Sequence, residues 1–196
     1  KRIATPKLIV DLSNTNPQAN ILGVVKTLDG NIYAYEYNGL HIITGDQVSD
    51  TLKIDENEQV VSATFDEDND QILFLTSNSK IISYKNKNFE FVDTSDESWK
   101  KATKITAYSG KIYLLSPEDN QIYRYQSTRT GFGKSENYSV NGIVKDAIDF
   151  AIDGFVYLLN KNGNIELLSR GENQNIQIEK NSIQELYNAS KIFTEF

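Results

Sequence analysis

The apolar positions of this chain form a motif that recurs four times. Runs of four consecutive apolar side chains begin at Ile32, Ile72, Ile112 and Val156 and read "IYAY", "ILFL", "IYLL" and "VYLL". Their first residues lie 40, 40 and 44 residues apart. Self-similarity at a nearly fixed period indicates a repeat architecture, so we expect each run to belong to one copy of a repeated unit.

Each copy contains four strand-like runs. One run precedes the apolar run and two follow it, and dipeptides typical of tight turns, such as Asp29-Gly30, Ser109-Gly110 and Asp153-Gly154, separate the first two. Four strands in ~40–45 residues is the period of a β-propeller blade. The sequence therefore predicts an all-β propeller of four four-stranded blades, with copies at about 21–54, 60–92, 103–140 and 147–178.

The second run of each copy also indicates how the blades are packed. A strand with one face in water alternates apolar and polar residues, whereas a strand covered on both faces has no need to alternate. Blades stacked around an axis cover each other on both faces. We therefore expect Leu114 and Leu115, which point to opposite faces of one strand, both to be buried. A solenoid of strands is the structural alternative, although its period is usually ~20–30 residues.

The two ends of the chain predict a further, incomplete blade. "KLIVDL" (7–12) is expected to form an outermost strand, and "KIFTEF" (191–196) an innermost strand. The chain contains no Met, even at position 1, so we interpret residues 1–196 as a single propeller domain taken from a longer protein. A ring left open exposes blade edges, and this predicts self-association through the opening.

Charge and composition exclude several classes of partner and cofactor. The formal net charge of −7 and the pI of about 4.8 argue against nucleic acid, because the basic surface that binds phosphates is missing. No apolar run approaches the ~18 residues of a spanning helix, so these residues predict no membrane insertion. The chain has no Cys, which removes disulfides and thiolate metal sites. We predict no cofactor.

Three stretches carry a resemblance to a known family: "PKLIVDLS", "WKKATKITAYSGKIYLLSPEDNQIYRY" and "AIDFAIDGFVYLLNKNGNIELLSRG". They resemble the C-terminal β-propeller of PPM-type phosphatase-like proteins of candidate-phyla (Patescibacteria) bacteria, over nearly the whole chain. In that family a phosphatase-like domain and a membrane helix lie upstream. The resemblance therefore implies an extracytoplasmic propeller tethered to the membrane. The phosphatase domain itself is not present in these residues, so no phosphatase ligand is carried over.

A short acidic stretch is the first candidate for chemistry. "DEDND" places Asp66, Asp68 and Asp70 at the spacing of a calcium-binding loop. Such a loop needs Gly at the next position and a bidentate Glu further on, but this chain has Gln71 and Ser77 there. A solvated hairpin turn is the preferred interpretation, with a weak surface calcium site as the alternative.

Three further residues are candidates for binding or catalysis. Trp99 is interpreted as a wedge between blades, with an exposed anchor for a partner as the alternative. Asp149 lies in an inner strand and is expected near the central channel. His41 is the chain's one histidine, and its strand-like surroundings favour a packed side chain over a member of a catalytic triad.

Three functional hypotheses follow from these patterns. The first is a non-catalytic propeller that acts as a binding or scaffolding module, because four blade-like copies occur without a convergent catalytic constellation. The second is a calcium-dependent propeller hydrolase with an axial site, suggested by Asp149 and the acidic balance. The third is a self-associating structural element. The sequence does not identify the protein or small molecule that the module binds.

Overall fold

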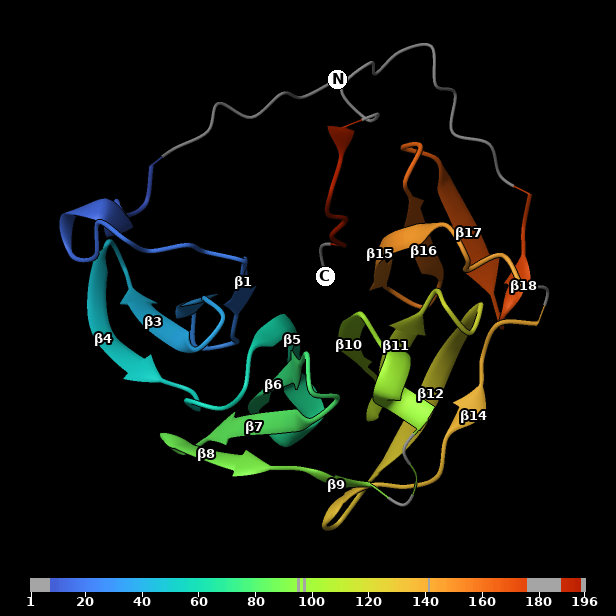
Figure 1. The fold of residues 1–196 in the computed structure, drawn as a ribbon, viewed down its shortest axis with the longest axis horizontal. Coiled ribbons are helices and arrows are strands. Elements are labelled where there is room, and N and C mark those ends of the chain that lie inside the picture. Colours follow the sequence, from blue (N-terminus) through green and yellow to red (C-terminus); the bar gives the residue numbers. More distant parts are fainter. Residues whose placement is uncertain (1–7, 95, 97, 141, 176–187, 195–196) are drawn as a thin grey trace.

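The chain folds into four β-sheets arranged around a central axis (Figure 1). The structure is a computed structural model, and it describes residues 8–94, 96, 98–140, 142–175 and 188–194. In each blade the first strand lies nearest the axis and the later strands follow outward. The four blades are antiparallel and contain β1 (Gly23–Lys26), β2 (Ile32–Tyr35), β3 (Gly39–Thr44) and β4 (Gln47–Lys53); β5 (Val60–Asp66), β6 (Gln71–Thr76), β7 (Ile81–Lys85) and β8 (Asn88–Phe91); β10 (Lys104–Tyr108), β11 (Lys111–Ser116), β12 (Gln121–Thr128) and β14 (Glu136–Asn137); and β15 (Ala147–Ile152), β16 (Val156–Asn160), β17 (Ile165–Ser169) and β18 (Glu172–Asn173).

Two short strands extend the third blade. β13 (Gly131–Phe132) pairs with the end of β12, and β9 (Asp93–Thr94), which follows blade 2, pairs with β13 in parallel. The parallel pair ties the outer edges of blades 2 and 3 together. Gly131 is required at this contact, because a Cβ there would lie 2.2 Å from the carbonyl oxygen of Asp93.

The turns between inner strands follow the sequence expectation. Ser109 and Gly110 have φ values of 50° and 67°, and a two-residue hairpin turn between antiparallel strands needs positive φ at both positions. Gly30 and Gly154 also have positive φ, of 85° and 108°. In the described part of the chain the helices are three short 3₁₀ turns, η1 (Leu12–Asn14), η2 (Glu67–Asn69) and η3 (Ser98–Lys101), none of them long or apolar enough to cross a membrane.

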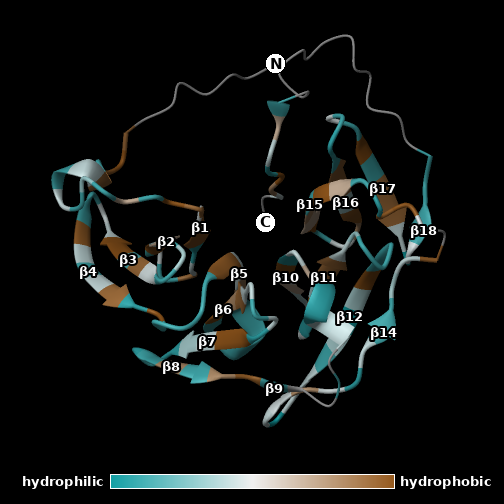
Figure 2. Ribbon diagram, in the orientation of Figure 1, coloured by the Kyte–Doolittle hydropathy of each residue, from teal (hydrophilic) through white to brown (hydrophobic). Residues whose placement is uncertain are grey.

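The core consists of apolar layers between successive blades. Ile112 and Leu114 pack in the cluster between blades 2 and 3, and Tyr113 and Leu115 pack in the cluster between blades 3 and 4. Leu114 and Leu115 are both 0% exposed, which confirms that β11 is covered on both faces. Figure 2 shows the hydrophobic residues concentrated on the strands and the hydrophilic residues on the loops and outer rim. The all-β propeller class is therefore confirmed.

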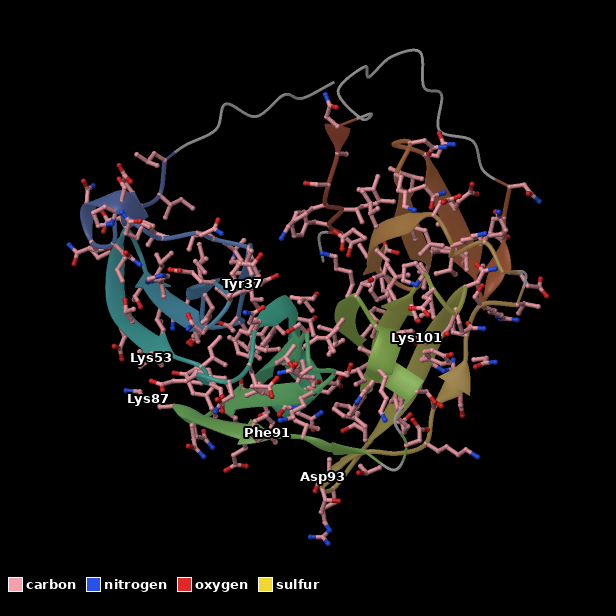
Figure 3. The ribbon with its side chains drawn as sticks, in the orientation of Figure 1. Tyr37, Lys53, Lys87, Phe91, Asp93 and Lys101 are labelled. Atoms are coloured by element: carbon pink, nitrogen blue, oxygen red, sulfur yellow. The ribbon has the colours of Figure 1, made fainter. Side chains whose placement is uncertain are left out.

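The outer strands face solvent. Figure 3 shows Lys53, Lys87 and Phe91 at the periphery of blades 1 and 2, far from the axis. Phe91 is 54% exposed, and the Lys80 ammonium lies 4.9 Å from its ring centroid. The side chains of this rim point to solvent and do not reach the centre of the ring.

The expected strands at the outer and terminal positions differ in detail from the structure. The fourth strand of blade 3 lies at 136–137 rather than 137–140, and that of blade 4 at 172–173, whereas the expected 175–178 falls outside the described residues except for Asn175. Residues 8–11 and 191–194 form no strand, and "KLIVDL" leads instead into η1. The physical reason is that a strand needs a hydrogen-bonded neighbour, and no strand of a fifth blade lies beside either segment in the described residues.

Candidate functional site

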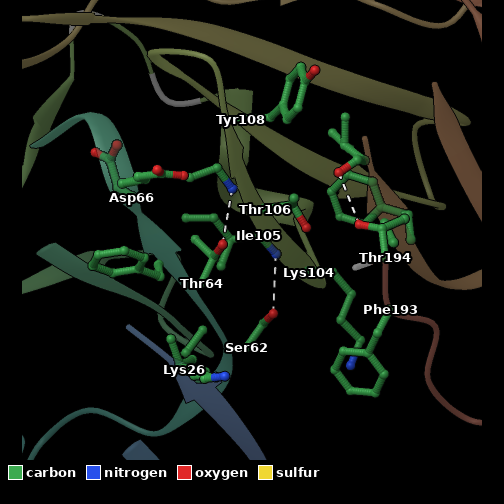
Figure 4. A pocket seen from close by; sticks show the side chains of 18 of the residues that line it. Lys26, Ser62, Thr64, Asp66, Lys104, Ile105, Thr106, Tyr108, Phe193 and Thr194 are labelled. Atoms are coloured by element: carbon green, nitrogen blue, oxygen red, sulfur yellow. Dashed lines mark hydrogen bonds between the residues drawn. The ribbon is translucent and has the colours of Figure 1, made fainter. Parts of the chain in front are cut away.

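A cavity of about 830 Å³ lies on the axis of the ring (Figure 4). Its wall consists of residues from the four innermost strands, β1, β5, β10 and β15, together with the segment Lys191–Thr194. Its volume is within the ~300–1,000 Å³ of typical ligand pockets. The cavity is therefore the candidate binding site.

Strand register defines one layer of residues around the cavity. In every blade one inner-strand residue pairs with the fourth residue of the apolar run: Gly23 with Tyr35, Ser62 with Leu75, Lys104 with Leu115, and Asp149 with Leu159. β5 and β15 each have a register shift just before this residue, and such bulges change the direction of a side chain. We call Gly23, Ser62, Lys104 and Asp149 the axial layer.

Hydrogen bonds between inner strands follow a fixed spacing along the chain. The backbone amides of Ile105 and Ala107 donate to the Ser62 and Thr64 hydroxyls of the preceding blade, at 3.2 and 3.0 Å, across 43 residues in each case. The amide of Ile192 donates to Asp149 Oδ2 at 2.9 Å, again across 43 residues. Residues 191–194 therefore stand beside blade 4 as the inner strand of a fifth blade would, and Lys191 joins the axial layer.

The same segment reaches blade 1 on its other side. The Lys191 ammonium donates to the carbonyl oxygen of Leu22 and lies 5.9 Å from the centroid of the Tyr35 ring. A Cβ on Gly23 would lie 2.7 Å from Lys191 Nζ and 2.5 Å from the Tyr35 hydroxyl. The missing side chain of Gly23 thus leaves room for both groups, and the segment bridges blades 4 and 1.

Lys104 breaks the pattern of acceptors in the axial layer. Ser62 and Asp149 accept from the following inner strand, and beside Gly23 the Tyr35 hydroxyl receives a backbone hydrogen bond from Ala63. Burial raises the pKa of Tyr35 to about 12, so this hydroxyl remains protonated. A lysine ammonium has no acceptor atom. At the junction of blades 3 and 4, Asp149 therefore receives the backbone hydrogen bond from Phe150 of its own strand.

Charge in the layer is concentrated in three groups. Burial raises the pKa of the Asp149 carboxyl, although backbone donors and Lys104 oppose the shift. Partial burial of its ammonium and the positive charge of Lys104 lower the pKa of Lys191, although Asp149 opposes that shift. The two lysines and the carboxyl group are therefore close enough to influence one another's charge.

The opposite mouth of the cavity carries three acidic side chains and one basic side chain, Lys26 at the end of β1. Asp66, Glu67 and Asp68 line it, and Asp66 lies about 13 Å from Ser62 along β5 at the ~3.3 Å rise of a strand residue. Asp66 Oδ2 accepts from Asn69 and Gln71 at 2.8 Å each, and Asp68 accepts from the amide of Gly110 at 2.6 Å. Asp70 is an exposed residue with φ of 48° after η2. The three aspartates of the calcium-like spacing thus have separate surroundings.

Metal ligation has no preassembled group within the described residues. No cluster of three or more His, Asp or Glu side chains there could hold a metal ion. Asp149 faces Lys104 and Lys191, whose positive charges oppose a cation at that place.

Trp99 and His41 lie outside the cavity wall. Trp99 is 5% exposed and packs between Leu73 of blade 2 and Leu114 of blade 3, which agrees with its interpretation as an inter-blade wedge. His41 is 2% exposed, with Nε2 2.6 Å from Glu36 Oε1 and Nδ1 3.1 Å from Thr51 Oγ1. Both side chains have structural roles in blade packing.

The structure adds residues that the sequence expectation did not single out. Asp149 was expected near the channel, and it lines the cavity. Lys104, Lys191, Tyr35 and Gly23 carry no motif that singles them out in the sequence. Gly23, Ser62, Lys104 and Asp149 lie 9, 10, 8 and 7 residues before the first residue of their apolar runs, so aligning the runs does not place them in one column. Their common layer depends on the strand register, and their proximity to Lys191 depends on the closure of the ring.

Comparison with known proteins identifies the fold. The chain matches no family model and no curated protein. Solved structures do match: RRP9 WD40 repeats, with a TM-score of 0.56 and 10% identity over 79% of this chain and 47% of that chain, and virginiamycin B lyase from Staphylococcus aureus, with a TM-score of 0.61 and 16% identity over 85% and 58%. A third is YCF48 bound to D1 peptide, with a TM-score of 0.54 and 12% identity over 79% and 51%.

These matches are to β-propellers that are longer than this chain. The chain spans about half the length of the WD40 structures it matches, 47% and 48% of the first two. At 7–16% identity the likeness shows the propeller fold.

Proposed function

We propose that this chain is a non-catalytic propeller module that binds its ligand in the axial cavity. The observation that carries the proposal is the cavity itself, which all four inner strands and residues 191–194 line with both apolar and polar side chains. A binding surface formed by several blades is rigid, because each inner strand is held by the apolar layers behind it. Rigid, preformed sites lose less entropy when a ligand binds.

The chemistry of the cavity wall supports binding over hydrolysis. Histidine, the most frequent general base, does not line the cavity, because the chain's one histidine is buried against Glu36 and Thr51 in blade 1. A calcium-dependent hydrolase would need several carboxylates around one point, whereas Asp149 is accompanied by Lys104 and Lys191. Neither observation favours the hydrolase hypothesis.

The structural neighbours are consistent with a binding role. WD40 repeats and a propeller bound to a peptide are among them. An enzyme, virginiamycin B lyase, is also among them, so the fold alone leaves the activity undetermined. The mixed apolar and polar wall of the axial cavity, which is typical of ligand pockets, is what favours a binding module in this chain.

The resemblance to phosphatase-like proteins supplies the wider context of the proposal. We propose that the module belongs to a larger membrane-anchored bacterial protein and is displayed on the outer side of the membrane. Surface labelling of intact cells that carry the full-length protein tests this placement. Labelling of propeller lysines only after cell lysis would contradict it.

A ligand screen by NMR tests the axial binding role. We expect ligands of a mixed neutral and charged library to shift amide signals of β1, β5, β10 and β15 and to be recovered chemically unchanged. Outer-strand residues such as those of β4 and β8 serve as the internal control. Turnover of a ligand, or shifts confined to the outer strands, would overturn the proposal.

Self-association is a second candidate, favoured by apolar side chains beside the opening of the ring. Leu8, Ile9 and Phe193 are 76%, 49% and 70% exposed, and they belong to the two segments that were expected to form the fifth blade. A second copy of the chain would cover them. Light scattering at high protein concentration should then give a mass above that of one chain, and a monomer mass would contradict this candidate.

A further inference from the structure

We propose that the axial cavity binds a carboxylate group between the ammonium groups of Lys104 and Lys191. The inference rests on the proposed axial binding role and specifies the chemistry of the ligand. Both residues lie in the cavity wall, Lys104 in the inner strand of blade 3 and Lys191 in the segment that bridges blades 4 and 1. Figure 4 labels Lys104 in this wall.

Lys104 occupies a position at which blade packing needs an acceptor. The other junctions use Ser62, Asp149 or the Tyr35 hydroxyl to receive an amide from the next inner strand. Lysine cannot do this, and its presence leaves Asp149 to accept from its own strand. The residue therefore contributes a positive charge to the cavity where a structural role would require an oxygen atom.

Lys191 brings a second ammonium to the same layer. Its Nζ donates to the Leu22 carbonyl beside the Tyr35 ring, which fixes one end of a flexible side chain. An ammonium has three donors, so two remain for a ligand. The charges of Lys104 and Lys191 repel each other, as the lowered pKa of Lys191 indicates. An anion between them would relieve this repulsion.

Asp149 balances one of the two positive charges. Its carboxyl accepts the amide of Ile192 and receives a second backbone hydrogen bond from Phe150. Two ammonium groups against one carboxyl leave a net positive charge in the layer. The layer thus has a charge that a single carboxylate of a ligand would neutralise.

The rest of the molecule favours a carboxylate over a polyanion. The chain carries a formal net charge of −7, and Asp66, Glu67 and Asp68 line the far mouth of the cavity. Phosphate-rich chains would be repelled at that mouth. A ligand with one carboxylate and a neutral or cationic remainder fits both ends, over the ~13 Å that separate Ser62 from Asp66 along β5. That length corresponds to about four extended peptide residues.

The carboxylate has two chemical sources, a small free acid or the C-terminus of a peptide, and the probes distinguish them. Succinate represents the first source, and tetra-alanine as the free acid represents the second. Tetra-alanine with an amidated C-terminus is the matched neutral probe. Binding of each to the whole chain is measured by isothermal titration calorimetry and by shifts of the axial amide signals.

The variants test the charges directly. We expect K104M and K191M each to weaken binding of the acid probes by about tenfold or more, because hydrogen bonds to charged groups are worth roughly 1.5–3 kcal/mol. D149N should tighten binding, because it removes the competing carboxylate. K145M is the control, since Lys145 is exposed outside the cavity wall, and it should bind as the wild type does. Thermal melts establish that each variant folds.

The outcomes separate this inference from the proposed function. Tighter binding of succinate than of the peptide acid identifies a small acid, and the reverse identifies a chain terminus; both support a carboxylate site. Equal binding of the amidated and free peptides, or no change in K104M and K191M, overturns the carboxylate site but leaves axial binding in place. No shift of axial signals with any library member overturns both.

Discussion

Blades 2 and 3 meet through a thick apolar layer, whereas blades 4 and 1 are joined by a single bridging segment. Between blades 2 and 3, Trp99 and Leu114 are buried in one cluster, and the amides of Ile105 and Ala107 bond to hydroxyls of β5. Between blades 4 and 1, the Ile192 amide makes the equivalent bond to Asp149, but Phe193 next to it is 70% exposed.

The axial hydrogen bonds and the apolar layers are therefore separable features of this fold. The axial hydrogen bonds form between inner strands and also between β15 and residues 191–194, which form no strand. Apolar burial, in contrast, requires the middle strands of a blade. The bridging segment makes the axial hydrogen bond but has no apolar layer behind it among the described residues. At that place the acceptor Asp149 and the donor Lys191 are ionisable, so the junction depends on pH and on charge in a way that the hydroxyl acceptors between blades 2 and 3 do not.

Truncation of Trp99 should give the largest effect. We expect Trp99→Ala to lower the free energy of unfolding by about 3–5 kcal/mol, because a large side chain is removed from a packed layer. Phe193→Ala at the bridging segment is the contrast and should stay within about 0.5 kcal/mol, as for other exposed sites. Urea melts of both variants measure the difference. Equal losses would mean that the two junctions are packed alike.

Truncation of either face of β11 tests whether the interior blades are covered on both sides. Leu114→Ala and Leu115→Ala should each cost about 2–5 kcal/mol. Lys145→Ala is the exposed control from the same blade region. If one of the two leucines tolerates the change as well as Lys145 does, that face of β11 is open to water and the stacked arrangement is incorrect.

Adding a methyl group at Gly23 tests the bridge itself. The new Cβ would lie 2.5 Å from the Tyr35 hydroxyl and 2.7 Å from Lys191 Nζ. Tyr35 is 5% exposed, so the lysine is the group that can move away. We expect Gly23→Ala to cost about 1–3 kcal/mol, the usual range for overpacking, and to speed hydrogen exchange at Ile192.

Gly39→Ala is the matched control for this change. Its Cβ would meet Glu36 at 3.7 Å, an ordinary contact, and Gly39 is also a strand residue of blade 1. Unchanged exchange at Ile192 in Gly23→Ala would show that Lys191 does not depend on the space beside Gly23.

The charge of Asp149 makes a smaller, pH-dependent contribution. Its pKa in the folded protein is raised above the ordinary 3.8 by burial, so the folded state holds its proton more tightly than the unfolded state. The stability from this group is therefore complete below pH 3.8 and is lost as pH rises through the raised pKa. Asp149→Asn keeps an acceptor for the Ile192 amide and leaves Lys104 and Lys191 unchanged. Its free energy of unfolding should rise relative to that of the wild type as pH increases.

Urea melts of wild type and Asp149→Asn between pH 3.5 and 7 measure this difference. The other carboxyl groups titrate alike in both proteins and cancel. A difference that grows as pH falls would contradict the prediction, because it would mean that the folded state favours the ionised carboxylate.

The smallest effect is expected at a surface ion pair far from both junctions. Arg124 donates through Nε and Nη2 to Glu136 Oε2 at 3.1 and 2.5 Å, on the outer strands of blade 3. Glu136 is 65% exposed, so Glu136→Ala should cost at most about 1 kcal/mol. Raising the salt concentration should reduce even this loss, and a larger loss that persists at high salt would mean that β14 contributes to the core.

The repeat, and hence the fold class, follows from the amino-acid sequence alone. Consecutive apolar residues in "ILFL" and "IYLL" are an intrinsic property of strands that are covered on both faces, and turn dipeptides such as Ser109-Gly110 require their conformation locally. The burial of Leu114 and Leu115 followed from this pattern, whereas that of Trp99 was expected from its size and aromatic character. Outer strands were misplaced by a few residues because their short, polar runs pair weakly and carry little periodicity.

Which residues meet on the axis depends on the tertiary structure. Lys104, Asp149 and Lys191 come from distant points of the chain, and of the three only Asp149 was expected near the channel, from its place in an inner strand-like run. They share one layer because the inner strands lie in register and because residues 191–194 stand where a fifth inner strand would, with the Ile192 amide bonded to Asp149. Local propensity fixes strands and turns, but proximity around a ring depends on closure, which is a property of the whole chain.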